Sequence, residues 1–335
     1  MFVNKDNLDS FIKPWLILMF ILIIVMIIIG GLTRLTDSGL SITAWEIFSG
    51  ILPPLTNEKW NFYFSEYKKI PEYQYLNFSM NLNEFKYIFY WEYFHRLFGR
   101  IIGLASILPL IYISIKYKIL FGIKKYYSIF FLVCVQGFLG WFMVKSGLSD
   151  NIDVSHYRLS IHLSMALIIL LIIFWFILDI FKIKKFSTKI SNYFIFSFLF
   201  IIFLQINLGA FLAGLDGGKI YNTWPDMNGY ILPDDVFLND YLTFNSFDNP
   251  SIMQFYHRIF GYLIIIFLII FNYISFKKKI EKKYILIFNL SIFLQILLGI
   301  LTLINGVTVV YASLHQAGSI FVLSSYLLIL YKNTN

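Results

Sequence analysis

The chain has 335 residues, of which 59% are hydrophobic and 14% are charged, and its formal net charge is +8. Soluble domains are about a quarter charged and less than half apolar, so this composition excludes an ordinary soluble protein and indicates an integral membrane protein. The lysines cluster in short loops beside apolar runs, so the positive charge does not indicate nucleic-acid binding. The single cysteine, Cys134, excludes an intramolecular disulfide and a thiolate metal cluster.

Several apolar runs are long enough to cross a bilayer, for which a helix needs about 20 residues. In chain order, we expect eight membrane-spanning helices near 15–31, 88–115, 126–144, 159–181, 193–214, 254–276, 284–304 and 311–331. The first run is too long for a signal-peptide core and no small-residue cleavage site follows it, so we expect it to be retained as a helix.

The loops between these runs alternate in charge. Lysines gather at 116–125, 182–189 and 277–283. Lysine and arginine mark cytoplasmic loops, so we expect these loops and both termini to be cytoplasmic. The long loops 32–87 and 215–253 would then face outward; they are rich in Trp, Pro, Asn and Asp and are expected to form an ordered cap.

The chain contains an internal duplication. The phrase Tyr-Phe-His-Arg-Leu-Phe-Gly-Arg at 93–100 returns at 255–262 as Phe-Tyr-His-Arg-Ile-Phe-Gly-Tyr. Other matched pairs are Gln136 to Gly140 with Gln295 to Gly299, His162 with His315, and Gly31 with Gly209. The predicted fold is therefore an all-α integral membrane protein whose eight transmembrane helices form two tandem four-helix bundles, at 1–185 and 186–335. A pseudo-two-fold axis along the membrane normal is expected to relate them.

Four of the five histidines lie near the outward-facing starts of even-numbered spans: His95, His162, His257 and His315. A single intramembrane histidine could equally be hydrogen-bonded across helices, but four in matched positions favour function. Paired imidazoles in a helix bundle hold heme iron. We expect His257 and His315 to ligate one iron, and His95 and His162 to flank a second pocket. Zinc is disfavoured because no cysteine and few inward carboxylates accompany the histidines.

The two halves differ at one acidic position. Glu92 lies three residues before His95, on the same helix face, and the corresponding residue in the second half is Gln254. Glu92 could be solvated by the outer loop or paired with Arg96. Alternatively, it is a catalytic carboxylate that acts as a base or stabilises developing positive charge. The asymmetry suggests that the second half holds a permanent heme and the first half does chemistry.

Three arginines accompany the histidines: Arg96, Arg100 and Arg258. Heme propionates are anions, for which guanidinium groups are suitable partners. Ordinary anchoring at the membrane interface is equally compatible with these positions. The fifth histidine, His156, is expected to be a solvated residue of the loop before the fourth span.

An ordered set of motifs along nearly the whole chain resembles the heme A synthase family, in its proteobacterial and mitochondrial branch. The motifs are Gly-Leu-Thr-Arg-Leu-Thr-Asp-Ser-Gly-Leu-Ser at 31–41, Trp-Glu-Tyr-Phe-His-Arg at 91–96, Tyr-Arg-Leu at 157–159 with His162, Asn-Thr-Trp-Pro-Asp-Met at 222–227, Tyr-His-Arg at 256–258 and Leu-His-Gln at 314–316. Other branches carry a cysteine pair in the first outer loop, which this chain lacks. Glutamine is usual where His156 stands.

The resemblance implies a reaction and a site. Such enzymes oxidise the C8 methyl group of heme O to a formyl group by successive hydroxylations, giving heme A for heme-copper oxidases. By resemblance, His257 and His315 match the ligands of a resident heme b, His95 and His162 match the substrate pocket, and Glu92 matches its essential carboxylate. The implied location is the bacterial inner membrane. Heme O synthase, an electron-transfer protein and a second copy of the chain are implied partners.

Two other functions compete with this interpretation. A di-heme cytochrome b-type electron carrier explains four histidines equally well, but it predicts two permanent hemes and leaves the difference between Glu92 and Gln254 unexplained. A heme-exporting transporter built from parallel repeats would favour broken helices near the membrane midplane, whereas these histidines lie toward one edge.

Overall fold

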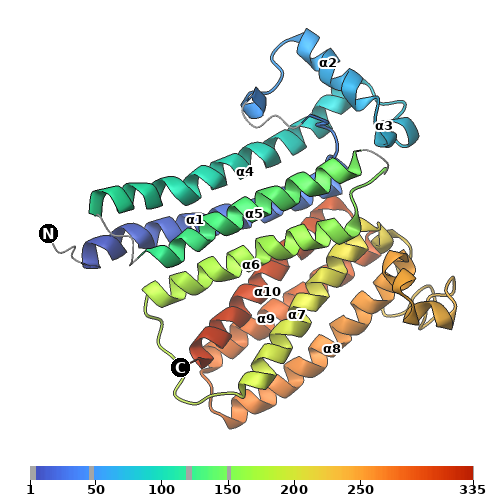
Figure 1. Cartoon of the computed structure of the whole chain (residues 1–335). Coiled ribbons are helices and arrows are strands. Elements are labelled where there is room, and N and C mark those ends of the chain that lie inside the picture. Colours follow the sequence, from blue (N-terminus) through green and yellow to red (C-terminus); the bar gives the residue numbers. More distant parts are fainter. Residues whose placement is uncertain (1–4, 45–48, 118–122, 149–151, 335) are drawn as a thin grey trace. The chain divides into compact units, whose positions relative to one another are not determined.

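The computed structural model describes residues 5–44, 49–117, 123–148 and 152–334. The regular secondary structure of these residues is helical, with no β-strand. Eight helices within them are long and apolar enough to cross a membrane, which confirms the predicted number of spans. They are α1 (Lys5–Leu35), α4 (Leu82–Tyr117), α5 (Lys124–Gly147), α6 (His156–Ile180), α7 (Asn192–Gly214), α8 (Pro250–Lys277), α9 (Lys282–Ile304) and α10 (Val309–Asn333) (Figure 1).

Shorter helices lie in the two long loops. The first loop holds η1 (Ser49–Ile51), α2 (Asn57–Tyr67) and α3 (Pro71–Tyr75), and the second holds η2 (Gly217–Lys219), η3 (Leu238–Leu242) and η4 (Phe244–Asp248). In the described residues the only bridge of β type joins Met227 to Tyr230, outside any strand.

The helices bordering the first long loop extend beyond the predicted spans. The hydroxyls of Thr33 and Thr36 donate to carbonyls one turn back, so polar residues continue α1. At the start of α4, Asn81 Oδ1 accepts the Glu84 N–H (3.2 Å) and Glu84 Oε2 accepts the Asn81 N–H (2.8 Å), a reciprocal cap. The loop therefore covers 36–81, not 32–87. His95 lies thirteen residues after the start of α4, whereas the other three histidines lie within two turns of theirs.

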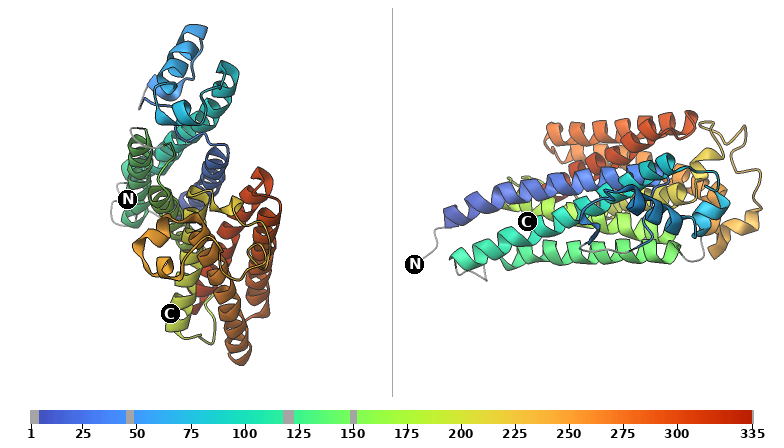
Figure 2. Two further views of the ribbon diagram at one scale, coloured as in Figure 1. Left: turned by 90° about the vertical axis from the view of Figure 1, so that its right-hand side faces the viewer. Right: turned by 90° about the horizontal axis from the view of Figure 1, so that it is seen from above.

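The chain divides into two compact units, Met1–Ile173 and Phe174–Asn335, with the boundary inside α6. In the first unit α4 packs against α1 and α5, and the paired course of α1 and α4 is visible in Figure 2. Trp15 Nε1 donates to the Ala105 carbonyl at 2.8 Å and so joins α1 to α4.

The second unit pairs α7 with α8 and packs α10 against α9 and α7. Two sets of polar contacts join segments of this unit. Asn272 on α8 and Asn289 on α9 exchange amide hydrogen bonds of 3.1 and 2.9 Å. At the end of α10, the Asn333 side chain bonds the N–H and the carbonyl of Ile190, at 2.8 and 3.0 Å, and so attaches the C-terminus to the residues before α7.

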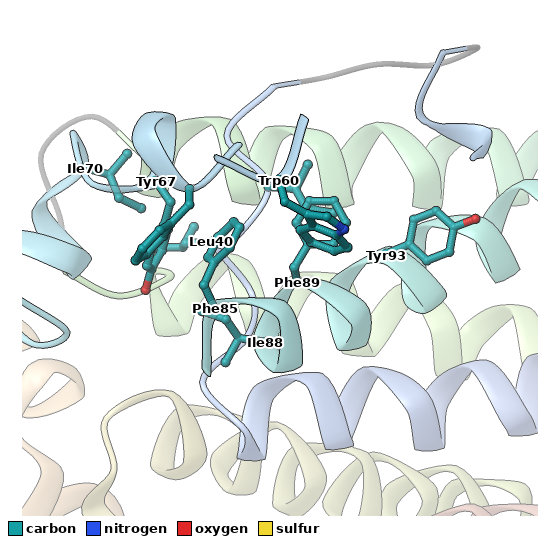
Figure 3. Close-up of a cluster of buried hydrophobic side chains, with 10 residues drawn as sticks. Leu40, Trp60, Tyr67, Ile70, Phe85, Ile88, Phe89 and Tyr93 are labelled. Atoms are coloured by element: carbon teal, nitrogen blue, oxygen red, sulfur yellow. The ribbon is translucent and has the colours of Figure 1, made fainter. Parts of the chain in front are cut away.

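The first long loop has its own aromatic core, which packs on the extended part of α4. Figure 3 shows Trp60 and Tyr67 of α2 beside Phe85 and Phe89 of α4. The Trp60 and Phe89 rings lie 5.0 Å apart between centroids. Burial of aromatic surface holds this segment against the helix that carries His95.

Candidate functional site

Each of the four predicted ligands is packed against a glycine on the preceding long helix. A Cβ built on that glycine would lie 3.2 Å or less from the imidazole Cε1, so a larger residue would displace the ring. The pairs are Gly30 (α1) with His95 (α4), Gly140 (α5) with His162 (α6), Gly209 (α7) with His257 (α8), and Gly299 (α9) with His315 (α10). Small residues let neighbouring helices approach closely, and here they make room for imidazoles.

Three of the four histidines are also held by a glutamine, which stands one turn before the packed glycine. The glutamine Nε2 donates to the backbone carbonyl of the histidine across the helix interface. The contacts are Gln136 to His162 (3.0 Å), Gln205 to His257 (2.9 Å) and Gln295 to His315 (3.0 Å). We call these contacts tethers, because each fixes the main chain of a predicted ligand to the adjacent helix.

The structure corrects the alignment of the two first spans by one residue. The glycine that packs against His95 is Gly30, so Gly209 matches Gly30 and not Gly31. The corrected alignment also matches two aspartates beyond the helix ends, Asp37 and Asp216, which both have left-handed backbone angles (φ 47° and 51°). The likeness between the units therefore continues from the helix into the start of each long loop.

In the second unit the imidazoles of His257 and His315 lie close together. Their ring centroids are 6.3 Å apart and their planes are inclined by 82°. Two metal–nitrogen bonds of about 2 Å each, together with the radii of two rings, place imidazoles on opposite sides of one iron at a centroid separation of about 6 Å. This separation is compatible with one heme iron that the two histidines would hold between them.

The surroundings of these two rings help to set their orientation. Metal-binding histidines usually donate their second ring nitrogen to a carboxylate, carbonyl or water. The Nδ1 atoms of His257 and His315 are buried and have no hydrogen-bond partner within the described part of the chain. Glycine packing and the glutamines of the adjacent helices contribute to the orientation of these residues, and Gln205 Nε2 also lies 3.4 Å from the His257 ring nitrogen Nε2.

In the first unit Glu92 is 3% exposed and both of its oxygens are engaged. Oε2 accepts the Ser41 hydroxyl and the Ile42 N–H, both at 2.7 Å. Oε1 accepts Arg96 Nη2 at 2.6 Å and Nε at 3.0 Å. The pairing with Arg96 weighed from the sequence is thus present, and Glu92 also attaches the first long loop to α4.

The second unit repeats this attachment without the negative charge. Gln254 Nε2 donates to the Tyr221 carbonyl at 2.8 Å, and Arg258 Nη2 donates to the same carbonyl at 3.1 Å. In the first unit Arg96 Nη2 correspondingly donates to the Ile42 carbonyl at 2.8 Å. Positions 92 and 96, like 254 and 258, therefore hold the start of a long loop against the histidine-bearing helix.

The remaining predicted site residue, Arg100, lies one turn beyond Arg96. Both arginines line a small cavity of about 20 Å³, together with Tyr63, Phe89 and Tyr93. Two guanidinium groups beside one cavity form a surface suited to an anion.

His156, expected in a loop, is instead the first residue of α6. The centroid of its ring lies 4.2 Å from that of the Tyr157 ring.

The tethers and Ser41 were not identified as site residues from the sequence. The repeated segments Gln136 to Gly140 and Gln295 to Gly299 were visible in the sequence, but they indicated only the internal duplication. Each glutamine donates to a histidine carbonyl on another helix, and the sequence around the glutamine does not indicate this contact.

Eight candidate spans, with half-buried histidines set against glycines on adjacent helices, define a polytopic helical membrane protein. Residues 13–327 match the COX15-CtaA family, described as "Cytochrome oxidase assembly protein", and the chain belongs to this family.

Individual relatives are similar over almost their full length. The chain is 62% identical to the heme A synthase of Pelagibacter ubique over 336 residues, which covers 100% of both chains. It is 40% identical to the heme A synthase of Rickettsia bellii, covering 92% of this chain and 94% of that one. It is 36% identical to the heme A synthase of Nitrosomonas eutropha, covering 94% and 92%.

Proposed function

We propose that the chain is a heme A synthase, an oxidoreductase that converts the C8 methyl group of heme O to a formyl group by successive hydroxylations. The observation that carries this proposal is the 62% identity to a heme A synthase over the whole of both chains. The difference between Glu92 and Gln254, in otherwise matched surroundings, supports a chemical difference between the two halves.

In this proposal His257 and His315 hold a resident heme b. Their centroid separation supports the assignment, and Gly209 and Gly299 leave room for the rings. When bound, heme b supplies one-electron transfer to or from the substrate side. The chain's own contribution is to fix both imidazoles, through glycine packing and the tethers to their carbonyls.

The substrate, heme O, is assigned to His95 and His162 in the first unit. Glu92 is assigned as the carboxylate that stabilises positive charge developing on the substrate, since its charge is buried beside the histidine-bearing face. Arg100 and Arg96 are assigned to the propionates of heme O, and Arg258 to those of heme b, with Arg96 and Arg258 also holding the loops.

The proposal includes a cellular setting that the sequence predicts. The protein would lie in the bacterial inner membrane with both termini in the cytoplasm, as the lysine-rich loops indicate. The two four-helix halves are predicted to be related by a pseudo-two-fold axis along the membrane normal. Heme O synthase, an electron-transfer protein and a second copy of the chain remain predicted partners.

Expression with a heme O source, followed by extraction and chromatography of the bound porphyrins, tests the function. Heme A is expected from the wild-type chain. H257A or H315A should lose or alter the resident low-spin spectrum, whereas H95A or H162A should keep that spectrum and form no heme A. Two molecules of unmodified heme b per chain and no heme A would instead establish the cytochrome b-type electron carrier.

A further inference from the structure

The tether is missing at one of the four histidines. In α1 the residue one turn before Gly30 is Met26, which has no N–H group in its side chain and cannot donate to the His95 carbonyl. The other three histidines all receive this hydrogen bond, at 2.9 to 3.0 Å. The first unit therefore has one tethered and one untethered histidine, and the second unit has two tethered ones.

Met26 occupies the same place in its unit as Gln205 does in the other. Its Cε lies 3.5 Å from the position of a Cβ on Gly99, one turn after His95. Gln205 Nε2 lies 3.7 Å from the position of a Cβ on Gly261, one turn after His257. The two side chains thus reach the same point on the histidine-bearing helix, and they differ in whether they donate a hydrogen bond there.

The difference has a mechanical consequence. An interhelical hydrogen bond within a membrane protein stabilises by about 0.6 kcal/mol on average and by about 1.7 kcal/mol at most. A methionine supplies a flexible, apolar contact that adapts to its neighbours without fixing them. The His95 main chain can consequently shift relative to α1 at lower cost than the His257 main chain can shift relative to α7.

We propose that Met26 is a positioning residue that makes His95 the yielding ligand of the first pocket, so that this pocket releases its porphyrin while the doubly tethered second pocket retains one. This proposal rests on the function proposed above. The first pocket would hold a product that must leave after each turnover, and the second pocket would hold a resident cofactor that must stay. His162, held by Gln136, then remains the fixed ligand of the first pocket.

Heme transfer to apomyoglobin tests this directly. The purified full-length chain is loaded with heme b at both pockets and mixed with excess apomyoglobin, and transfer is followed by absorbance. H95A and H257A identify the kinetic phase that belongs to each pocket. M26Q supplies the missing donor, M26L is the matched control without a donor, and Q205M removes one tether from the second pocket.

We expect the first pocket to release heme faster than the second in the wild-type chain. M26Q should slow the first phase about 3- to 10-fold and raise its low-spin absorbance, as one added hydrogen bond would. M26L should show no slowing, and Q205M should accelerate the second phase by a similar factor. A merely structural role for Met26 would make M26Q and M26L alike.

The proposal is overturned if the wild-type chain shows no faster first phase, if M26Q and M26L give the same rates, or if M26Q slows both phases equally. If M26Q does not fold, which loss of the second phase would reveal, an unchanged second phase in Q205M overturns it. If the wild-type chain forms no heme A but shows these release rates, the proposed enzymatic function is wrong and the proposal about Met26 still stands.

Discussion

At the scale of single residues, Glu92 combines two tasks, of which its counterpart Gln254 performs one. Its carboxylate holds the first long loop through Ser41 and Ile42 and also pairs with Arg96. Gln254 performs only the attachment, to the Tyr221 carbonyl. A buried charge that loses its partner is costly, so the variant that tests the charge should change the shape of the side chain as little as possible.

E92Q is that variant, because it keeps the shape of Glu92, retains one acceptor oxygen and imitates Gln254. We expect heme A formation to fall about 100-fold or more, as removal of a preorganised charge does in other active sites, while the resident heme spectrum stays unchanged. E92A should destabilise the protein more than E92Q does, by about 3 to 5 kcal/mol in all, since it removes every hydrogen bond to Ser41, Ile42 and Arg96 as well as the charge. A normal heme A yield from E92Q would remove the charge from the mechanism.

The glycines facing the imidazoles give a second prediction. A Cβ on Gly140 would lie 2.9 Å from His162 Cε1, whereas a Cβ on Gly137, on the same helix, meets nothing within 4 Å. G140A should displace the imidazole and abolish substrate binding, measured by heme titration. G137A should bind normally and gain up to about 1 kcal/mol of stability from better helix propensity. Equal behaviour of the two variants would show that His162 is not confined by Gly140.

At the scale of helices, the amide pair between α8 and α9 is suited to a double-mutant cycle. In N272L or N289L the surviving asparagine keeps a polar side chain within the span but loses its partner, so each single variant should lose about 1 kcal/mol in reversible unfolding. The double variant should recover part of this loss, since no polar group is left unpaired. Simple addition of the two losses would show that the bonds of 3.1 and 2.9 Å contribute nothing jointly.

The first long loop contains a buried carboxyl outside the spans. Burial is the main cause that raises the pKa of Glu72 from its ordinary 4.5 to about 8, and the Tyr67 hydroxyl, which donates at 3.0 Å, opposes the rise. The folded loop therefore binds this proton more tightly than the unfolded chain does. Its stabilising contribution is complete below about pH 4.5 and is lost as the pH rises to about 8.

Limited proteolysis of the loop between pH 5 and pH 9 measures this effect. Wild-type protection should decline across the interval by up to about 1.4 kcal/mol per pH unit. E72Q, which is neutral throughout, should be protected equally at both ends. E58Q, at an exposed position on α2, serves as the matched control and should behave like the wild type. An unchanged decline in E72Q would assign the pH dependence to other groups.

At the scale of the whole molecule, hydropathy predicted all eight spans, because a bilayer accepts little backbone structure other than apolar helices. It could not predict where α1 and α4 end, since these ends are made by polar residues such as Thr33 and Asn81. The histidines stood out because imidazoles are rare in an apolar chain. The role of Met26 could not be predicted, because it depends on contacts between helices far apart in sequence.

The repeated layout has a practical consequence, because the chain supplies an internal reference for its own variants. A change at Glu92 or Gly140 has a counterpart at Gln254 or Gly299 in the same polypeptide. A spectral difference between paired variants therefore reports the altered contact, because expression level, detergent and iron supply affect both copies equally.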